Sequence, residues 1–411
     1  MYTELSEKFK DTAQGDIASK VIAKCVHCGF CNATCPTYQL LGDELDGPRG
    51  RIYQMKQVFE GAQPTAEIAL HLDRCLTCRN CETTCPSGVE YHKLVDVSRE
   101  LIEQHVSRPG LEKLQKWLLR TFLTRRQIMT PVFRCAQLFR GIMPAVIKKN
   151  IPVKQEVGDW PVNIHSRRML ILDGCVQPGM KPLTNSAAAR VLDRLNIAVV
   201  KELQDGCCGA LSFHLNAQDQ AKQQMRRNID AWWPHVEAGI EAIISSASGC
   251  GVMIKDYADV LADDENYAKK AKHISTLTKD LSQVISNEDL QILNLKIDAK
   301  NSVTVAYHPP CTLQHGQKLG GIVESILKRC GFELTPISDS HLCCGSAGTY
   351  SIFQKDLSAQ LLRDKIKAIN QGQPEYIATA NIGCQLHLES ASELPVIHWI
   401  ELLDRYLNRA G

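Results

Sequence analysis

The sequence of 411 residues predicts a small helical, cysteine-rich domain of the α+β class, followed by an α/β module with parallel strands that occurs twice. Two observations lead to this prediction. The pattern C-x2-C-x2-C-x3-C-P occurs at residues 25–36 and again at residues 75–86. From residue 168 onward, short apolar strands alternate with helical segments, and the whole series repeats. Such alternation is typical of a parallel sheet covered by helices.

Composition and charge indicate a globular protein without membrane-spanning segments. Hydrophobic residues make up 44% and charged residues 22%, and the net charge of +2 provides no strong attraction to nucleic acid. The first 20 residues are polar, without the apolar core of a signal peptide, and no stretch has about 18 uninterrupted apolar residues. We therefore interpret most of the eighteen cysteines as metal ligands in a reducing compartment and expect a cytoplasmic protein.

The two cysteine motifs have the spacing that holds [4Fe–4S] clusters in bacterial-type ferredoxins. Three closely spaced thiolates of one motif can reach the same cubane, while the fourth cysteine and its proline lead the chain to the other. The expected ligand sets are Cys25, Cys28, Cys31 and Cys85 for one cluster, and Cys75, Cys78, Cys81 and Cys35 for the other. Paired zinc sites or disulfides are the alternatives, which two identical patterns disfavour. Two neighbouring clusters would form an electron relay.

Helices are expected around these motifs: one within residues 1–20, one from about Arg51 after the breaker at residues 47–50, and one over residues 89–106. Between the motifs, acidic residues at positions 43, 44 and 46 precede Arg49 and Arg51. They could form ion pairs that brace the loop. The small free energy of surface ion pairs favours a solvated surface instead.

The span 113–155 has ten Lys or Arg residues and no Asp or Glu, and apolar residues are interleaved among them. Basic amphipathic helices of this kind can lie on an anionic membrane surface or bind an acidic partner. A helical linker packed on its own domain is the simpler interpretation. We expect four parts in the chain: a cluster domain (1–105), a basic helical linker (106–165) and two cysteine-rich modules (166–290 and 300–411).

The two modules correspond element by element. In each, a strand leads to a cysteine, a helix and a second strand lead to a Cys-Cys-Gly sequence, and a later strand leads to a fourth cysteine. The interval from the first cysteine to the double cysteine is 32 residues in both copies, Cys175 to Cys207 and Cys311 to Cys343. This is an internal duplication. We call the copies the first and second CCG modules.

Each CCG module contains four cysteines that are expected at the carboxyl ends of parallel strands, where ligands bind in such sheets. The quartets are Cys175, Cys207, Cys208 and Cys250 in the first module, and Cys311, Cys343, Cys344 and Cys384 in the second. Four thiolates suffice for one cluster, so one or two further clusters are hypothesised here. Burial of cysteine as a small apolar residue is the alternative, and it is favoured only for Cys135 and Cys330, which lie outside any pattern.

No motif for substrate oxidation accompanies the cysteines. The sequence lacks a dinucleotide fingerprint, a P-loop, a zinc-protease motif and a serine-hydrolase elbow. Four histidines could carry protons near a cluster, although a structural role is more common for each: His214, His315, His341 and His387. We therefore expect no catalytic residue, flavin or NAD on this chain, and a flavin or similar catalyst on another.

Several runs resemble the iron–sulfur subunits of bacterial glycolate oxidases (glycolate dehydrogenases). They are CVHCGFCNATCPTYQLLGDELDGPRGRIY, LDRCLTCRNCETTCPSGV, NIDAWWP, SHLCCGSAGTY and TANIGCQLH. The resemblance implies flavin-containing partner subunits that oxidise glycolate to glyoxylate. It also implies that this chain passes the electrons to a respiratory acceptor, expected to be quinone, as a peripheral protein at the cytoplasmic face of the inner membrane.

The second half also resembles the CCG cysteine-rich domains of heterodisulfide reductases and of the third subunit of anaerobic glycerol-3-phosphate dehydrogenase. Those reductase modules commonly end in C-x-x-C, whereas here Cys250 is followed by Met253 and Cys384 by His387. The missing cysteine argues against a cluster that needs five thiolates. Three alternatives stay open: electron transfer for another 2-hydroxy acid or for glycerol 3-phosphate, thiol–disulfide reduction at the CCG cysteines, and a scaffold that only binds flavin subunits.

Overall fold

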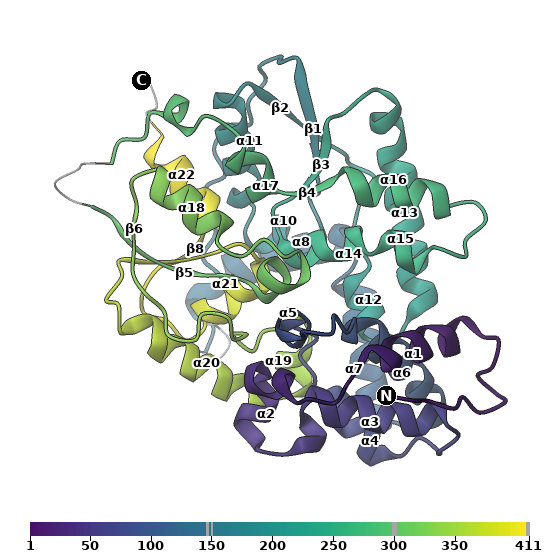
Figure 1. Cartoon of the computed structure of the whole chain (residues 1–411). Coiled ribbons are helices and arrows are strands. Elements are labelled where there is room, and N and C mark those ends of the chain that lie inside the picture. Colours follow the sequence, from purple (N-terminus) through teal and green to yellow (C-terminus); the bar gives the residue numbers. More distant parts are fainter. Residues whose placement is uncertain (145–147, 149–150, 298–301, 408–411) are drawn as a thin grey trace.

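A computed structural model describes residues 1–144, 148, 151–297 and 302–407. Its N-terminal part is helical, and its remainder contains two four-stranded parallel sheets, which confirms the predicted fold class. In Figure 1 the purple N-terminal helices lie together on one side of the two sheet-containing modules. None of the helices in the described ranges is long and apolar enough to cross a membrane.

The N-terminal part packs its helices around one apolar core, which includes Ile22, Met55, Phe59, Leu72 and Leu94. The helices are α1 (Ala13–Lys24), η1 (Phe30–Thr34), α2 (Pro36–Leu41), η2 (Glu44–Asp46), α3 (Pro48–Phe59), α4 (Ala66–Asp73), α5 (Asn80–Thr84) and α6 (Tyr91–His105). The predicted helix over residues 89–106 is confirmed as α6. The first predicted helix is displaced, because the Thr12 hydroxyl accepts from the backbone N–H of Gly15 and so starts α1 only at Ala13.

The basic span forms α7 (Gly110–Phe122), α8 (Arg126–Leu138) and η3 (Arg140–Ile142). Residues 145–147, 149 and 150 of this span lie outside the described residues. Helix α8 packs on the first CCG module, since the Phe133 ring contacts Gly179 and Arg126 pairs with Asp173 and Asp205. Much of the apolar surface of these helices nevertheless stays exposed, as Trp117 shows with half of its side chain accessible.

The first CCG module has strand order β2-β1-β3-β4, all parallel. Its elements are β1 (Arg167–Ile171), α10 (Gln177–Met180), α11 (Leu183–Arg194), β2 (Ile197–Lys201), α12 (Ala210–His214), α13 (Gln218–Glu237), β3 (Ala242–Ser245), α14 (Ser248–Lys255), α15 (Tyr257–Val260), α16 (Ala268–Leu277), β4 (Thr278–Asp280), α17 (Leu281–Ser286) and η4 (Leu290–Leu293).

The second CCG module repeats this order as β6-β5-β7-β8. Its elements are β5 (Thr304–His308), η5 (Thr312–Gly316), α18 (Ile322–Arg329), β6 (Glu333–Leu334), α19 (Tyr350–Phe353), α20 (Lys355–Asn370), β7 (Tyr376–Thr379), α21 (Ile382–Glu389), β8 (Val396–His398) and α22 (Trp399–Tyr406).

The two modules share one hydrophobic core. Met169 and Ile171 of β1 point into it together with Val305 and Tyr307 of β5. Alternate residues such as Leu170 face a second core formed with α13, α14 and α16, because successive side chains of a strand point to opposite faces of the sheet. The duplicated modules therefore form one body with the carboxyl ends of their strands available for a site.

Candidate metal centres and the family of the chain

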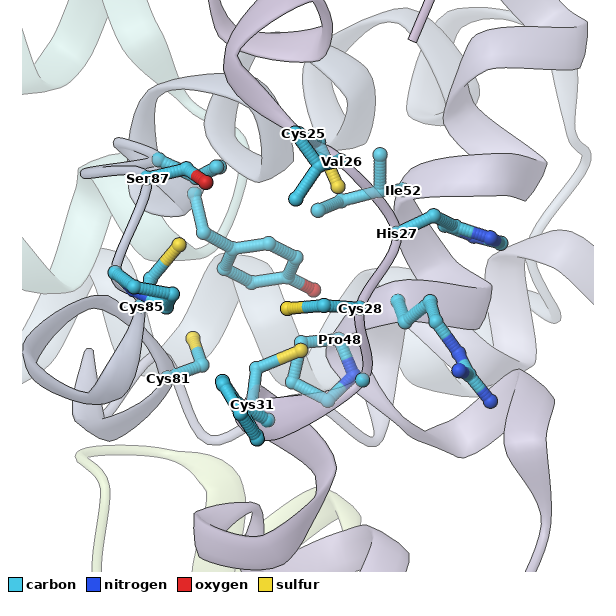
Figure 2. Close-up of a pocket in the computed structure, with 16 residues that line it drawn as sticks. Cys25, Val26, His27, Cys28, Cys31, Pro48, Ile52, Cys81, Cys85 and Ser87 are labelled. Carbon is cyan, nitrogen blue, oxygen red and sulfur yellow. The ribbon is translucent and has the colours of Figure 1, made fainter.

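The first cysteine motif curls around a small cavity at the end of α1. Cys25 and Cys28 precede η1, Cys31 lies within it, and all three line the cavity with Cys85 of the second motif. Figure 2 shows these four sulfurs turned toward a common space, with Cys81 at its lower edge. The fourth cysteine of the second motif thus joins the three closely spaced cysteines of the first.

The second motif forms the reciprocal cavity, lined by Cys75, Cys78 and Cys81 of its own loop and by Cys35 of the first. Both loops use the same backbone turn. His27 and Thr77 have φ of 60° and 53°, and Gly29 and Arg79 have φ of 88° and 59°. These left-handed residues fold each loop tightly enough for its three thiols to converge.

The donor chemistry of both cavities suits a cluster. Burial raises the pKa of the Cys31 thiol to about 11, and it raises the pKa of the Cys78 and Cys81 thiols well above their ordinary range. Thiols so placed ionise at neutral pH only when a bound cation compensates the charge. Two donors point at the sulfur of Cys75, namely the backbone N–H of Thr77 at 3.4 Å and the Tyr91 hydroxyl at 3.8 Å.

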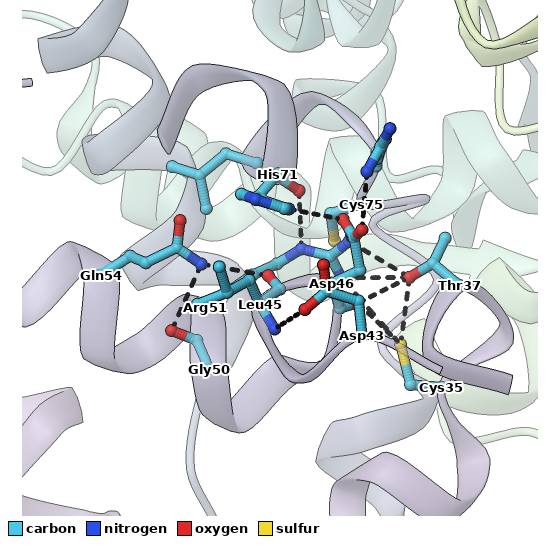
Figure 3. Close-up of polar contacts among 12 residues, drawn as sticks. Cys35, Thr37, Asp43, Leu45, Asp46, Gly50, Arg51, Gln54, His71 and Cys75 are labelled. Carbon is cyan, nitrogen blue, oxygen red and sulfur yellow. Dashed lines mark hydrogen bonds and ion pairs between the residues drawn. The ribbon is translucent and has the colours of Figure 1, made fainter. Parts of the chain in front are cut away.

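A buried charge network supports the second cavity (Figure 3). Asp46 is fully buried and pairs with Arg51 at 3.2 Å, with Arg74 at 2.7 Å and with His71 at 3.0 Å. The guanidinium of Arg51, 1% exposed, also lies 4.0 Å from the sulfur of Cys35. The expectation of a solvated surface at residues 43–51 was therefore wrong for Asp46 and Arg51. Tertiary packing buries the pair, and the opposing charges satisfy each other inside.

In both CCG modules the four cysteines of the quartet lie close together. In the first module the thiols of Cys175, Cys207, Cys208 and Cys250 form a continuous series of hydrogen-bonding contacts. The same series runs through Cys311, Cys343, Cys344 and Cys384 in the second. The fourth cysteine of each quartet lies in the first turns of α14 or α21, directly after the strand that precedes the helix.

One histidine in the second module was missed by the sequence reasoning. The ring of His308 has a nitrogen within 4.8 Å of the sulfurs of both Cys344 and Cys384. Its signal was its place at the end of the strand, three residues before Cys311. Of the four histidines considered from sequence, His315 is held by Thr83 at 2.9 Å and by the His341 carbonyl at 3.1 Å, which is a structural role.

Two of the remaining three histidines differ in setting: the His387 ring contacts the Ser358 hydroxyl at 3.2 Å, whereas His214 lines a central cavity described below. The two cysteines outside any pattern also differ from each other. Cys330 is partly buried, and burial raises the pKa of its thiol to about 11. Cys135 is exposed on α8, so the expectation of a buried thiol was wrong there.

A central cavity of about 950 Å³ is lined by the cluster domain, by helix α7 and by both CCG modules. It is bordered by Cys75 of the cluster domain, by Lys116 of α7 and by cysteines of both quartets. Helix α5 reaches between the modules, where the Asn80 amide donates to the His341 carbonyl at 3.3 Å. Arg79, beside it, pairs with Asp256 of the first module. Cys75 of the cluster domain and most cysteines of both CCG quartets thus line one cavity.

Comparison with known proteins matches this geometry. Residues 21–89 match the 4Fe-4S dicluster domain, and residues 169–255 and 305–389 match the cysteine-rich domain. The chain is 50% identical over 410 residues to the glycolate oxidase iron-sulfur subunit of Escherichia coli (strain K12), with both chains covered completely. The chain belongs to the glycolate oxidase iron–sulfur subunit family.

Two more distant relatives are also found. The probable glycolate oxidase iron-sulfur subunit of Bacillus subtilis (strain 168) is 28% identical over 95% of this chain and 94% of its own. Lactate utilization protein A of Geobacillus kaustophilus is 25% identical over 53% of this chain and 90% of its own. The glycolate oxidase iron–sulfur subunit family therefore identifies the chain as an iron–sulfur component of an oxidoreductase, whose task is electron transfer.

Proposed function

We propose that this chain is the electron-transfer subunit of a glycolate-oxidising complex. Flavin-containing partner subunits oxidise glycolate to glyoxylate, and this chain passes their electrons to a respiratory quinone at the cytoplasmic face of the inner membrane. The observation that carries the proposal is the pair of adjoining cavities. In each, the three closely spaced cysteines of one motif meet the fourth cysteine of the other, and Cys81 of the second motif lines both cavities. Membership of the glycolate oxidase iron–sulfur subunit family supports glycolate as the substrate of the partner subunits.

Each cavity is assigned one [4Fe–4S] cluster, held by the crossed ligand sets expected from the spacing. The first set is Cys25, Cys28, Cys31 and Cys85, and the second is Cys75, Cys78, Cys81 and Cys35. A [4Fe–4S] cluster supplies one-electron chemistry when it is bound. The chain holds the thiolates in place, excludes water with Ile52 and Val89, and directs the Arg51 cation toward the second set.

The first CCG quartet is assigned a further cluster, because its four thiols form one contact series and border the central cavity beside Cys75. Four iron atoms per cubane make this assignment countable. About eight irons per chain would place clusters only in the cluster domain, about twelve would add a cluster in one CCG module, and about sixteen would add one in each. Iron and acid-labile sulfide, measured on the anaerobically purified chain, distinguish these counts.

The test of the function is reconstitution with the flavin subunits. We expect glycolate-dependent quinone reduction only when this chain and the flavin subunits are combined. Replacing a proposed ligand, Cys81→Ser, should abolish transfer to quinone. The matched control Cys135→Ser, at an exposed cysteine on α8, should retain it. Full quinone reduction without this chain, or by the Cys81→Ser complex, would contradict the proposal.

The same reconstituted complex distinguishes the substrates. Glycolate should be oxidised in preference to lactate and glycerol 3-phosphate if the proposal is right. A preference for either of these would move the chain to another dehydrogenase while leaving its role in electron transfer intact. Turnover of a disulfide by the isolated chain with an artificial reductant would instead favour the reductase alternative.

Membrane contact is proposed for helices α7 and α8. Their exposed apolar side chains are Leu111, Leu114, Trp117, Leu118, Phe122, Ile128, Val132 and Leu138. Exposed basic residues accompany them, and an anionic surface attracts such a combination. Arg126 is not among the free cations, since it donates to the Leu203 carbonyl at 2.6 Å and pairs with Asp173.

Flotation with vesicles tests this contact. The chain should bind vesicles that contain anionic lipid, and the double charge reversal Arg125→Glu/Arg134→Glu should reduce binding by at least about thirtyfold, because two lost cations at about 1 kcal/mol each amount to about 2 kcal/mol. The control is Lys269→Glu/Lys272→Glu, on the exposed side of α16. An equal loss of vesicle binding in both double variants, or no loss in either, would contradict the proposed membrane contact.

A further inference from the structure

The central cavity is larger than bound clusters would require. Its volume of about 950 Å³ is that of a pocket which encloses a whole organic ligand. A [4Fe–4S] cluster adds only four irons and four sulfides to the cysteines that hold it. Apart from cysteines, the lining includes apolar side chains of four helices, among them Leu70 of α4, Leu111 of α7, Leu211 of α12 and Ile352 of α19. The cavity therefore has room for an apolar molecule beside any cluster.

His214 presents a polar group to this cavity. Much of its side chain is accessible although the surrounding protein encloses it, because its accessible surface faces the cavity. The ring contacts that of Phe213, with centroids 5.8 Å apart, and it makes no hydrogen bond to any of the residues that the structure describes. Burial and the charge of Arg99 lower the pKa of His214 to about 4. The ring is therefore neutral, and one of its nitrogens carries a hydrogen that it can donate to a ligand.

Two further donors border the same space. Arg99 is 9% exposed and donates to the Thr77 hydroxyl at 3.0 Å and to the Cys75 carbonyl at 2.8 Å, but its Nε has no partner among the described residues. The hydroxyl of Tyr350, a residue that is 7% exposed, is also unpaired within the described ranges. Both side chains line the cavity. Buried donors are nearly always paired, so these groups indicate a bound molecule with acceptor oxygens.

The apolar lining of the cavity continues onto the outer surface of α7. Leu111 lines the cavity and is also 68% exposed to solvent. Leu114 and Leu118 follow it on the same face of the helix, and both are exposed. Membrane contact is proposed above for these same side chains. A ligand dissolved in the lipid phase can therefore reach the cavity along α7.

We infer that the central cavity is where this chain binds and reduces a lipid-soluble quinone. In this arrangement the N–H of His214 donates to one carbonyl oxygen of the quinone ring, and the apolar tail leaves the cavity beside Leu111. An apolar molecule with two acceptor oxygens matches both the apolar lining and the unpaired donors. The inference rests on the proposed function, which gives quinone as the acceptor and assigns it no site.

The position of the cavity suits the reduction of a quinone. Two electrons and two protons convert its two C=O groups to C–O–H groups and give a quinol. The electrons come from glycolate through the flavin subunits and this chain, and the protons come from water. Cys75 of the cluster domain and Cys250 of the first CCG module both line the cavity. Two of the proposed one-electron centres therefore adjoin a two-electron acceptor.

The test uses the full-length chain, purified anaerobically with its clusters, reduced with dithionite and then freed of excess reductant. Reoxidation is followed by the visible absorbance of the clusters after addition of decylubiquinone or of ferricyanide, a hydrophilic acceptor that needs no apolar cavity. His214→Phe keeps an aromatic ring but removes the N–H. It should raise the quinone concentration needed for half-maximal rate by about fivefold, as expected for one lost hydrogen bond.

Leu211→Trp tests the volume of the cavity, because the larger side chain fills space beside His214 on α12. Reoxidation by decylubiquinone should be lost in this variant, whereas the rate with ferricyanide should equal that of the wild type in both variants. The matched control is His273→Gln, at an exposed histidine of α16 that does not line the cavity. This control should follow the wild type with either acceptor.

Labelling with a photoreactive azidoquinone supplies a measurement that does not depend on turnover. The label should be found in peptides of α7 or α12, and excess decylubiquinone or Leu211→Trp should suppress it. Wild-type quinone kinetics in both cavity variants, or labelling confined to other peptides, would overturn the inference while leaving quinone as the acceptor. A wild-type chain that reduces ferricyanide but no quinone would contradict the acceptor in the proposed function as well.

Discussion

The interface between the two CCG modules contains a carboxylic acid that opposes folding when it ionises. Glu401 of α22 is 4% exposed, and the Thr184 hydroxyl of α11 donates to it at 2.6 Å. Burial raises the pKa of Glu401 from its ordinary value of 4.5 to about 7, because the ionised carboxylate loses its hydration. The hydrogen bond from Thr184 and the charge of Lys181 oppose this rise only in part.

The size of the effect follows from this pKa. Each pKa unit between the folded and unfolded chain corresponds to about 1.4 kcal/mol. A carboxyl group with a raised folded-state pKa stabilises the fold below its unfolded pKa, and this contribution disappears as the pH rises through the folded value. The loss therefore spans pH 4.5 to about 7 and reaches about 3 kcal/mol in total. Glu401→Gln removes the ionisation but can still accept from Thr184.

The assay is thermal or urea unfolding, under anaerobic conditions, as a function of pH. Between about pH 5.5 and about pH 8.5 the Glu401→Gln chain should gain about 2 kcal/mol of stability relative to wild type. The control Glu393→Gln, at an exposed carboxylate, should follow the wild-type profile. Parallel profiles of wild type and Glu401→Gln over this range would refute the reasoning.

Three further predictions concern the clusters and their supports. Arg51→Gln removes a buried cation that lies 4.0 Å from the Cys35 sulfur. It should lower the midpoint potential of one cluster by about 60 mV in an EPR-monitored redox titration, which is equivalent to about 1.4 kcal/mol for one electron. An unchanged potential would contradict the assignment of Cys35 as a ligand. Asp256→Asn breaks the partly buried ion pair with Arg79 and should destabilise the junction of the cluster domain and the first module by about 1 kcal/mol. The measurement is amide hydrogen exchange, which should become faster over residues 75–85. Unaltered exchange there would show that the ion pair does not stabilise the junction. Gly345→Ala places a side chain where φ is 90° and within 2.7 Å of a backbone oxygen. It should therefore destabilise the second module by at least about 2 kcal/mol in a denaturant titration. An unfolding midpoint equal to that of the wild type would contradict the described turn.

The metal chemistry of the N-terminal part could be predicted from local sequence. Eight cysteines and two prolines at fixed spacing define which thiols can reach the same centre, because the intervening loops have only two or three residues. Duplication made the α/β half predictable in the same way. The order of strands and helices is repeated, and parallel strands bring their carboxyl ends to one edge. These inferences need no knowledge of distant contacts.

Other features depended on which distant residues pack together. Sequence reasoning favoured a solvated surface for residues 43–51, yet the fold buries Asp46 against Arg51, Arg74 and His71. A histidine at the end of a strand is ordinary in sequence. Only the approach of Cys344 and Cys384, which follow 36 and 76 residues later, gives His308 its chemical setting.

The sequence by itself determined the type of chemistry, the crossed pairing expected of the ferredoxin-type motifs, and the duplicated α/β architecture. Cysteine spacing and strand periodicity are local properties of the sequence and can be recognised without knowledge of the tertiary structure. Tertiary structure alone decided which charges are buried, that α5 enters between the modules, and that Cys75 and cysteines of both CCG quartets line one cavity. Burial and convergence are set by long-range packing, in which residues hundreds of positions apart exclude water from the same space.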